Sequence, residues 1–188
     1  MYDLTKIQEK VESYLDKKRF NHTLGVRYTA AALAMCHGED ILKAEVAGLL
    51  HDCAKCIHDD ELLALCRQHE IVISDTECAM PFLLHAKVGA WFAYEKYQIK
   101  DTDILNAITY HTTGRPQMSL LEKIVYLADY IEPEREQIPR LAEIRKECFR
   151  DIDKALEIAL ANTIYYCEAS ENRIDETTRL AYEFYKNK

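Results

Sequence analysis

The sequence predicts an all-α protein, a helical bundle in a single domain. Apolar side chains recur every three or four residues along almost the whole chain, as they do on the buried face of amphipathic helices. Glycine and proline make up only nine of the 188 residues, about 5% where roughly 12% is usual. A chain of this length fits one hydrophobic core, and no linker, repeat or change of composition marks a boundary. We therefore expect residues 1–188 to form one domain.

The first half of the chain contains six predicted helices. Leu4, Ile7, Val11 and Leu15 are spaced as one apolar helix face and predict a helix over residues 3–17. The same periodicity predicts helices at 22–36, 41–55, 60–69, 82–97 and 102–111. Gly38 closes the second of these six helices, Asp40 is the N-cap of the third, and Pro81 precedes the fifth.

The second half also reads as helical. Ser119 and Glu122 form a capping box for a helix that runs to about Ile131 and is stopped by Pro133. Further helices are predicted at 139–149, 152–169 and 176–186. The run Ile71-Val72-Ile73 is typical of a strand, but it is too short and too isolated to anchor a sheet.

The charge and the termini limit the possible partners. The formal charge of −8 argues against a broad basic groove that would hold nucleic acid. A small anionic substrate can still bind where metal ions or a few Lys and Arg side chains make the electrostatic potential positive within one pocket. The N-terminal ten residues carry charges and no apolar core, and no apolar run approaches the eighteen or so residues needed to span a bilayer. We expect a cytoplasmic protein that binds neither nucleic acid nor membrane.

Seven cysteines form an odd set without the spacing of a disulfide framework, which suits a reducing compartment. Cys53 and Cys56 form a C-x-x-C within a predicted helix, but no second pair completes a zinc site. Structural thiols are the favoured interpretation, and a redox or zinc role is the alternative.

Several histidines and aspartates lie where a core is expected. Because their neighbours in the sequence are apolar, these side chains are expected to be buried. Buried polar groups need hydrogen-bond or ion-pair partners. A single one of them is best explained by a hydrogen bond to the backbone or by an ion pair. Together they offer nitrogen and oxygen ligands that suit iron, manganese, cobalt or zinc better than calcium. The residues concerned are His22, His51, Asp52, His85, His111 and Asp129.

Glycines lie about one helical turn from each of these four histidines. Gly25 follows His22 by three residues, and Gly48 precedes His51 by three. Gly89 and Gly114 follow the other two histidines. Since glycine inside a helix costs about 1 kcal/mol relative to alanine, these positions suggest close approach of backbone to a partner helix or ligand.

The order of these six residues resembles that of the HD superfamily of metal-dependent phosphohydrolases, over about residues 15–135. The flanking segments narrow the resemblance to the YqeK-type family, the symmetrical bis(5'-nucleosyl)-tetraphosphatases. These segments are Arg19-Phe20-Asn21-His22-Thr23, Leu49 to Lys55, His111-Thr112-Thr113-Gly114 and Tyr126 to Arg135. The resemblance implies an HD-type helical domain, on which the C-terminal helices pack, and hydrolysis of diadenosine tetraphosphate into two ADP.

The resemblance also implies the roles of individual residues. His22, His51, Asp52 and Asp129 match the ligands of the first metal. His85 and His111 match additional histidines that either complete a second metal site, with Asp52 bridging, or face the substrate phosphates. The cofactor is then one or two transition metal ions, with iron favoured and manganese, cobalt or zinc as the other choices.

Substrate contacts are expected from cationic and hydroxyl side chains near the ligands. Asp52 and Lys55 are the expected catalytic residues, and Lys55 would neutralise a phosphate or the leaving diphosphate, unless it is a solvated lysine at a helix end. Arg19 and Arg135 flank the motif and are favoured as phosphate clamps, because guanidinium binds phosphate in a bidentate manner. Thr112 is a further candidate, and Arg173 is suggested by the resemblance alone.

Other functions stay open at this point. An HD-type nucleotide phosphomonoesterase or phosphodiesterase would use the same ligands with a different pocket. A non-catalytic helical interaction module would need the histidines only as satisfied core residues. The expected partners are the dinucleoside polyphosphate substrate and the nucleoside diphosphate product, and a homodimer through the C-terminal helices is possible.

Overall fold

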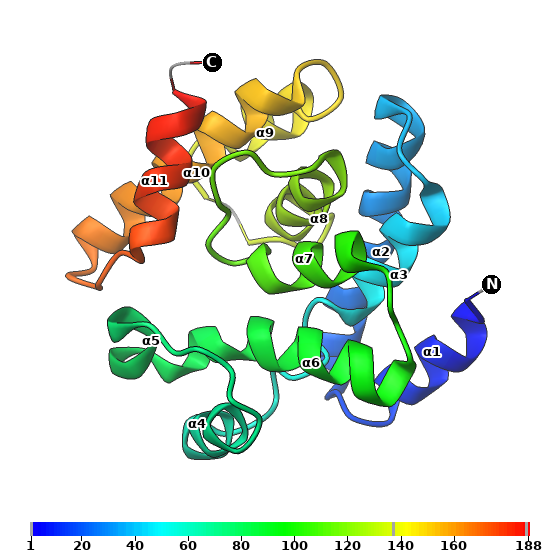
Figure 1. Cartoon of the computed structure of the whole chain (residues 1–188). Helices are drawn as coiled ribbons and strands as arrows, with labels where there is room; N and C mark the ends of the chain where they lie inside the picture. The colour runs from blue at the N-terminus through cyan, green and yellow to red at the C-terminus, as the bar shows by residue number, and fades with distance from the viewer. Residues whose placement is uncertain (1, 137, 187) are drawn as a thin grey trace.

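The structure, a computed structural model, describes residues 2–136, 138–186 and 188. Over these residues the chain forms eleven α-helices, one short 3-10 helix and no strand, which confirms the all-α prediction (Figure 1). The helices are α1 (Leu4–Glu12), α2 (Lys17–His37), α3 (Ile41–Leu50), α4 (Asp59–Gln68), α5 (Asp75–Ala79), η1 (Pro81–Leu84), α6 (His85–Tyr97), α7 (Thr102–Tyr110), α8 (Leu120–Ile131), α9 (Leu141–Glu147), α10 (Ile152–Ala169) and α11 (Glu176–Tyr185). The assignment of the whole chain to one domain stays a prediction.

Side-chain caps define where most helices begin. The Asp40 carboxylate accepts the Lys43 N–H, and the Ser119 hydroxyl accepts the Glu122 N–H while the Glu122 carboxylate accepts the Ser119 N–H. Gly38 ends α2 with a φ of 79°, and its N–H donates to the Ala34 carbonyl. These caps were readable from the sequence because each depends on residues within four positions of one another.

Four boundaries differ from the prediction by three residues or more, and the others agree to within two residues. The expected helix over 3–17 ends at Glu12, and the carboxylate of Asp16 accepts the Arg19 N–H at 2.8 Å, so α2 begins five residues before the expected start. The expected helix over 41–55 ends at Leu50, and residues 51–56 form turns. The predicted helix over 82–97 begins as the 3-10 helix η1, and α5, with its own capping box from Ser74, was not predicted.

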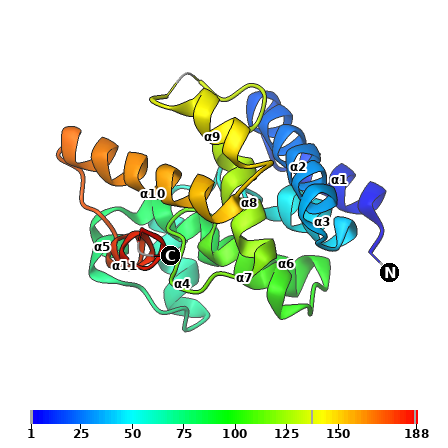
Figure 2. The same cartoon turned by 90° about the horizontal axis from the view of Figure 1, so that it is seen from above.

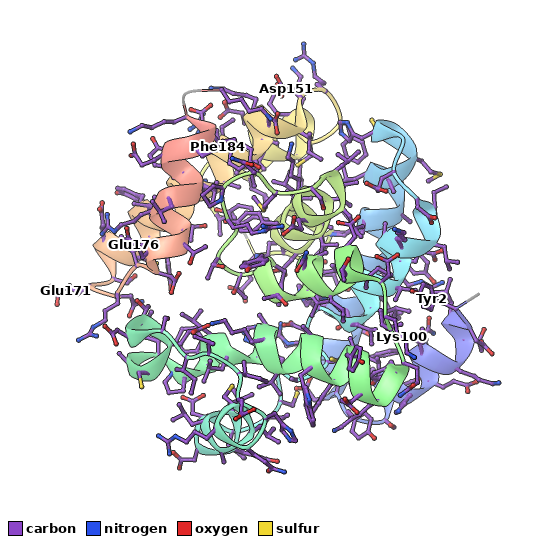
Figure 3. All side chains as sticks on the ribbon, in the orientation of Figure 1. Tyr2, Lys100, Asp151, Glu171, Glu176 and Phe184 are labelled. Atoms are coloured by element: carbon purple, nitrogen blue, oxygen red, sulfur yellow. The ribbon has the colours of Figure 1, made fainter. Side chains whose placement is uncertain are left out.

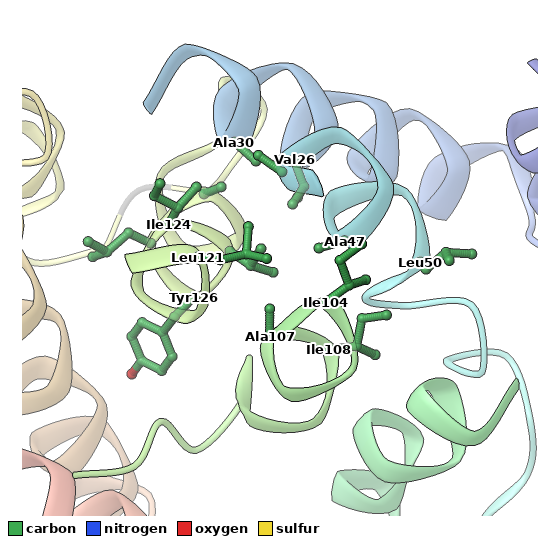
Figure 4. Close-up of a cluster of buried hydrophobic side chains, with 14 of the residues drawn as sticks. Val26, Ala30, Ala47, Leu50, Ile104, Ala107, Ile108, Leu121, Ile124 and Tyr126 are labelled. Carbon is green, nitrogen blue, oxygen red and sulfur yellow. The ribbon is translucent and has the colours of Figure 1, made fainter. Parts of the chain in front are cut away.

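The core lies between α2, α3, α7 and α8. Figure 4 shows Val26 and Ala30 of α2 and Leu121 of α8 meeting apolar side chains of α3 and α7. The buried apolar side chains of the described residues form one cluster. Helix α8 lies near the middle of the molecule in both views, with α1 on one side and α10 and α11 on the other (Figure 2). Of the helices in the described part of the chain, none is long and apolar enough to cross a membrane.

Gly48 lets α3 approach α2 closely. A Cβ atom at Gly48 would lie 2.9 Å from the Cα of Arg27 and 3.2 Å from its backbone nitrogen. Backbone atoms of a helix cannot move aside as a flexible side chain can, so the two helices would have to separate. The sequence hint that this glycine marks a close approach is therefore correct for Gly48.

Replacing Gly48 with alanine is expected to destabilise the fold by about 1–2 kcal/mol. Overpacking typically costs about 1–3 kcal/mol, and the better helix propensity of alanine returns up to about 1 kcal/mol of it. The measurement is the free energy of unfolding from a urea titration of the parent and the variant. A variant as stable as the parent would contradict the close contact between α2 and α3.

Candidate metal centre

Four histidines from four different parts of the chain converge on one aspartate. His22 lies in α2, His51 follows α3, His85 begins α6, and His111 follows α7. Their Nε2 atoms lie 3.1–3.8 Å from the carboxylate oxygens of Asp52. The helical core therefore brings together residues that are up to 89 positions apart in the sequence.

Each of these imidazoles is held through its other nitrogen. The Nδ1 atoms of His51, His85 and His111 lie 2.5–2.8 Å from the backbone carbonyl oxygens three residues earlier. The Nδ1 of His22 lies 3.2 Å from the Oε1 of Glu132. Because these acceptors require a proton on Nδ1, each ring in its neutral form carries its lone pair on Nε2, which is the tautomer of a metal-ligating histidine.

The carboxylate of Asp52 lies between two pairs of histidines, His22 with His51 and His85 with His111. Its Oδ2 faces His51 and His22, at 3.4 Å and 3.8 Å from their Nε2 atoms. Its Oδ1 faces the other two histidines, at 3.1 Å from the Nε2 of His85 and 3.6 Å from that of His111. One aspartate thus offers one oxygen to each side.

Asp129 lies next to the first of these pairs. Its Oδ1 lies 3.1 Å from the Nε2 of His22 and 4.0 Å from that of His51. The residues predicted as ligands of the first metal are therefore neighbours in the structure. One oxygen or nitrogen atom from each of His22, His51 and Asp129 lies within 4.8 Å of the others, and so do those of His51, Asp52 and His111.

Unpartnered nitrogens test whether this cluster fits a metal ion. Among the described residues, the Nε2 atoms of His22 and His51 are buried and have no hydrogen-bond partner. The Nε2 atoms of His85 and His111 lie only 3.2 Å apart, with lone pairs that repel each other unless a cation or proton lies near them. Buried imidazole nitrogens without partners, beside two carboxylates, fit a transition metal.

The electrostatics of the cluster also favour a cation. Burial raises the pKa of Asp52, but the charge of His51 and the contacts with His111 and His85 lower it by more, so the pKa lies well below its ordinary value. Burial likewise raises the pKa of Asp129, while the contact with His22 and the charge of His51 outweigh it and lower the pKa. Both carboxylates are thus held ionised in a buried site.

Three cations lie next to the cluster. Arg19 Nη1 is 2.8 Å from the Oδ2 of Asp52, and Arg135 Nη1 is 3.7 Å from the Oδ1 of Asp129. Lys55 Nζ lies 3.5 Å from both ring nitrogens of His85. All three side chains are partly exposed.

The two remaining substrate candidates differ in their placement. Thr112 is half-buried in the turn that follows α7, next to His111. Arg173 is exposed in the loop between α10 and α11, and does not line the cleft beside the cluster. The labels of Glu171 and Glu176 in Figure 3 mark this loop at the edge of the molecule.

A cleft of about 660 Å³ adjoins the cluster on the side of α2. Arg19, His22 and Arg135 are part of its lining, and so are Tyr130 from α8 and Tyr166 from α10. The lining also contains acidic side chains, those of Asp16, Glu132, Glu134 and Glu136. A space of this size, with cations and aromatic rings in its lining, could hold a phosphorylated nucleoside.

The sequence interpretation missed Glu132, which is 2% exposed and contacts His22. The sequence could have pointed to Glu132, because it follows Asp129 by three residues. That spacing places the two side chains on the same face at the end of α8. Tyr130 and Asn162 of the cleft were also missed. Twelve tyrosines in the chain left no basis for choosing Tyr130 from the sequence.

The C-x-x-C lies in the turns after α3 and not in a helix as expected. Cys53 is buried and its thiol donates to the Gly89 carbonyl at 3.6 Å, whereas Cys56 is exposed. Within the described part of the chain all seven cysteines are free, and neither of these two belongs to a cluster of metal-binding groups.

The cysteines are expected to divide into two classes by reactivity. Burial raises the pKa of Cys53 and of Cys148 to about 12, so almost no thiolate forms there at pH 8. In a titration of the folded protein with a disulfide reagent, the exposed Cys36, Cys56 and Cys78 should react first. Cys53 and Cys148 should react only after unfolding, and rapid modification of either, located by mass spectrometry, would contradict the structure.

Comparisons with known proteins place this arrangement in a family. The model of the HD domain family matches residues 19–134. A protein of Halalkalibacterium halodurans named bis(5'-nucleosyl)-tetraphosphatase, symmetrical, is 41% identical over 181 residues, which cover 94% of each chain. A protein of Bacillus subtilis with the same name is 38% identical and covers 93% of this chain and 92% of its own.

A solved structure has the same fold. It is the crystal structure of a protein of Clostridium acetobutylicum described as a predicted HD superfamily hydrolase involved in NAD metabolism. The two structures superpose with a TM-score of 0.95 at 40% sequence identity, over 100% of this chain and 98% of the other. With its His-Asp cluster, its helical fold and these relatives, the chain belongs to the HD domain family and, within it, to the family of the symmetrical bis(5'-nucleosyl)-tetraphosphatases.

Proposed function

We propose that this chain hydrolyses diadenosine tetraphosphate symmetrically into two molecules of ADP, with the His-Asp cluster as its metal centre. The observation that carries this proposal is the convergence of four histidine Nε2 atoms and an Asp129 oxygen around the carboxylate of Asp52. The curated relatives named for this activity match the chain over nearly its whole length. HD-domain hydrolases bind divalent metals, which agrees with the composition of the cluster.

The residues divide into two candidate metal positions. His22, His51, Asp52 and Asp129 would hold the first ion, and Asp52 would bridge to a second ion held by His85 and His111. Mixed imidazole and carboxylate ligands suit iron, manganese, cobalt or zinc, and iron is the metal we favour among them. A metal bound here would supply an activated water nucleophile and polarise a phosphoryl oxygen.

The cations beside the cluster would bind the polyphosphate. Arg19 and Arg135 line the cleft and contact Asp52 and Asp129, so a tetraphosphate bound to them would have its charges next to the candidate metal ligands. Lys55 lies beside His85, where its ammonium group would stabilise the charge on the departing diphosphate. Thr112 would add a hydrogen-bond donor next to His111, whereas Arg173 would have to reach the substrate from the α10–α11 loop.

Symmetrical cleavage depends on where the first nucleoside diphosphate is held. If the cleft binds one adenosine and its first two phosphates, the anhydride next to the cluster is the central one. Hydrolysis there breaks the bond between the second and third phosphates, adds water across it and releases two ADP. Tyr130 and the exposed Tyr166 offer aromatic rings for stacking on the adenine.

A substrate panel tests this proposal against the other HD-type activities. Diadenosine tetraphosphate, a nucleoside monophosphate and a cyclic nucleotide are incubated separately with metal-loaded protein, and the products are separated by chromatography. We expect ADP from the tetraphosphate and no product from the other two. Inorganic phosphate from the monophosphate, or opening of the cyclic nucleotide, without ADP from the tetraphosphate would overturn the proposal.

The oligomeric state and the cellular compartment of the protein stay predictions. We expect a cytoplasmic enzyme whose partners are its substrate and product, with no nucleic acid or membrane partner. A homodimer through the C-terminal helices is possible, and Tyr165, Tyr166 and Leu180 are exposed apolar side chains on α10 and α11.

A further inference from the structure

His22 differs from the other three histidines of the cluster in how its ring is held. The Nδ1 atoms of His51, His85 and His111 face backbone carbonyls three residues earlier, so their own helical turns orient them. The Nδ1 of His22 faces the side chain of Glu132, 110 residues away at the end of α8. Its orientation therefore depends on a contact between two helices.

Glu132 is itself fixed in place. Its carboxylate Oε1 lies 3.2 Å from His22 Nδ1, and its Oε2 accepts the N–H of Glu134 at 2.7 Å. Arg145 Nη2 donates to the backbone carbonyl of Glu132 at 2.8 Å. Because both carboxylate oxygens and the backbone are held, the acceptor for His22 has little freedom to move.

Among the described residues, no Lys or Arg side chain forms an ion pair with the Glu132 carboxylate. Glu132 is 2% exposed, and its one ion-pair contact in the described part of the chain is His22. A buried carboxylate without a compensating positive charge is costly. Through the His22 ring Glu132 is linked to the candidate metal position, and a cation bound there would compensate its charge.

Gly25 provides the space for this carboxylate. A Cβ atom at Gly25 would lie 2.7 Å from the Oε2 of Glu132, closer than such atoms approach. Gly25 is one turn beyond His22 on the same side of α2. Helix α2 thus carries both the imidazole and the gap that lets its acceptor reach it.

We propose that Glu132 is the positioning residue for His22, holding the ring in the tautomer and orientation that direct Nε2 toward Asp129, and that Gly25 is required for this contact. The inference rests on the metal centre of the proposed function. A carboxylate acceptor on Nδ1 fixes the ring and makes Nε2 a better donor to a metal, and loss of such a partner typically lowers metal affinity about 10–100-fold.

The test measures the affinity of the chain for Co²⁺ without substrate. Metal-free parent, Glu132→Ala and Glu132→Gln are titrated with Co²⁺ against a chromophoric chelator, and the visible absorption of bound Co²⁺ is recorded. We expect Glu132→Ala to lose about 10–100-fold in affinity and to change the spectrum. Glu132→Gln should lose less, since its amide oxygen still accepts the His22 proton.

Glu122→Gln is the matched control. Glu122 is also a buried carboxylate of α8, but it pairs with Arg115 and caps the helix away from the cluster. This variant should lower the melting temperature and leave the Co²⁺ affinity and spectrum unchanged. An equal loss of affinity in Glu122→Gln and Glu132→Ala would show a general effect of destabilising α8 and overturn the inference.

Gly25→Ala tests the same contact with every polar side chain retained. The variant should bind Co²⁺ more weakly than the parent, because the added methyl group displaces the Glu132 carboxylate. Parent-like affinity in Gly25→Ala or in Glu132→Ala, or equal losses in Glu132→Ala and Glu132→Gln, would contradict the inference while leaving the metal centre intact. A parent protein that binds no Co²⁺ would instead count against the metal centre itself.

Discussion

Replacing Asp52 with asparagine is expected to abolish hydrolysis of diadenosine tetraphosphate, with kcat reduced on the order of a thousandfold or more. The Asp52 carboxylate faces all four histidines of the cluster, and an amide lacks the negative charge that both candidate metal positions share. The bound metal should fall in the same variant. The measurements are the rate of ADP release and the metal content by elemental analysis.

Asp153→Asn provides a control for this experiment. Asp153 is an ion-paired aspartate of α10 that contacts Lys123 and Lys188 and takes no part in the cluster. Its replacement should leave kcat and the metal content near those of the parent. An Asp52→Asn variant that is folded, holds its metal and hydrolyses at the parent rate would remove Asp52 from the mechanism.

Replacing His111 with alanine is expected to remove one metal ion per chain and to lower kcat on the order of a hundredfold. The Nε2 of His111 lies 3.2 Å from that of His85 and 3.6 Å from the Oδ1 of Asp52, so it belongs to the second pair of histidines. His22 and Asp129 do not depend on it and should still hold the first ion. Metal content per chain and steady-state kinetics check both parts.

The same variant separates the two roles that the sequence left open for His85 and His111. If His111 binds a substrate phosphate, its loss will raise KM and leave the metal content unchanged. That result would contradict the second metal position. His69→Ala is a suitable control, because His69 follows α4 and stacks on Trp91 outside the cluster.

Much of the candidate site was predictable because its residues lie in sequence patterns that can be recognised from neighbouring residues alone. The six His and Asp positions lie in or directly after segments with an apolar helical pattern, where buried polar groups need partners, and the structure brings all six together. The caps at Asp40 and Ser119 were readable for a similar reason, since a cap depends on residues three or four positions apart.

The rest depends on contacts between distant segments. Nothing local in the sequence joins His22 to Glu132, because their contact exists only when α2 packs on α8. The end of α3 at Leu50 was missed because the apolar pattern continues through residues that form turns around the cluster. The cleft likewise forms from side chains of α2, α8, α10 and the segment between α8 and α9, and no single segment carries its pattern.

The metal centre and the symmetrical cleavage can be tested together on a single protein sample. Protein purified without chelator is assayed for metal content by elemental analysis, and the same sample is incubated with diadenosine tetraphosphate and its products are separated. We expect near-stoichiometric transition metal and ADP as the sole nucleotide product. ATP and AMP as products would contradict symmetrical cleavage, and a protein that binds no metal even after reconstitution would contradict the ligand assignment.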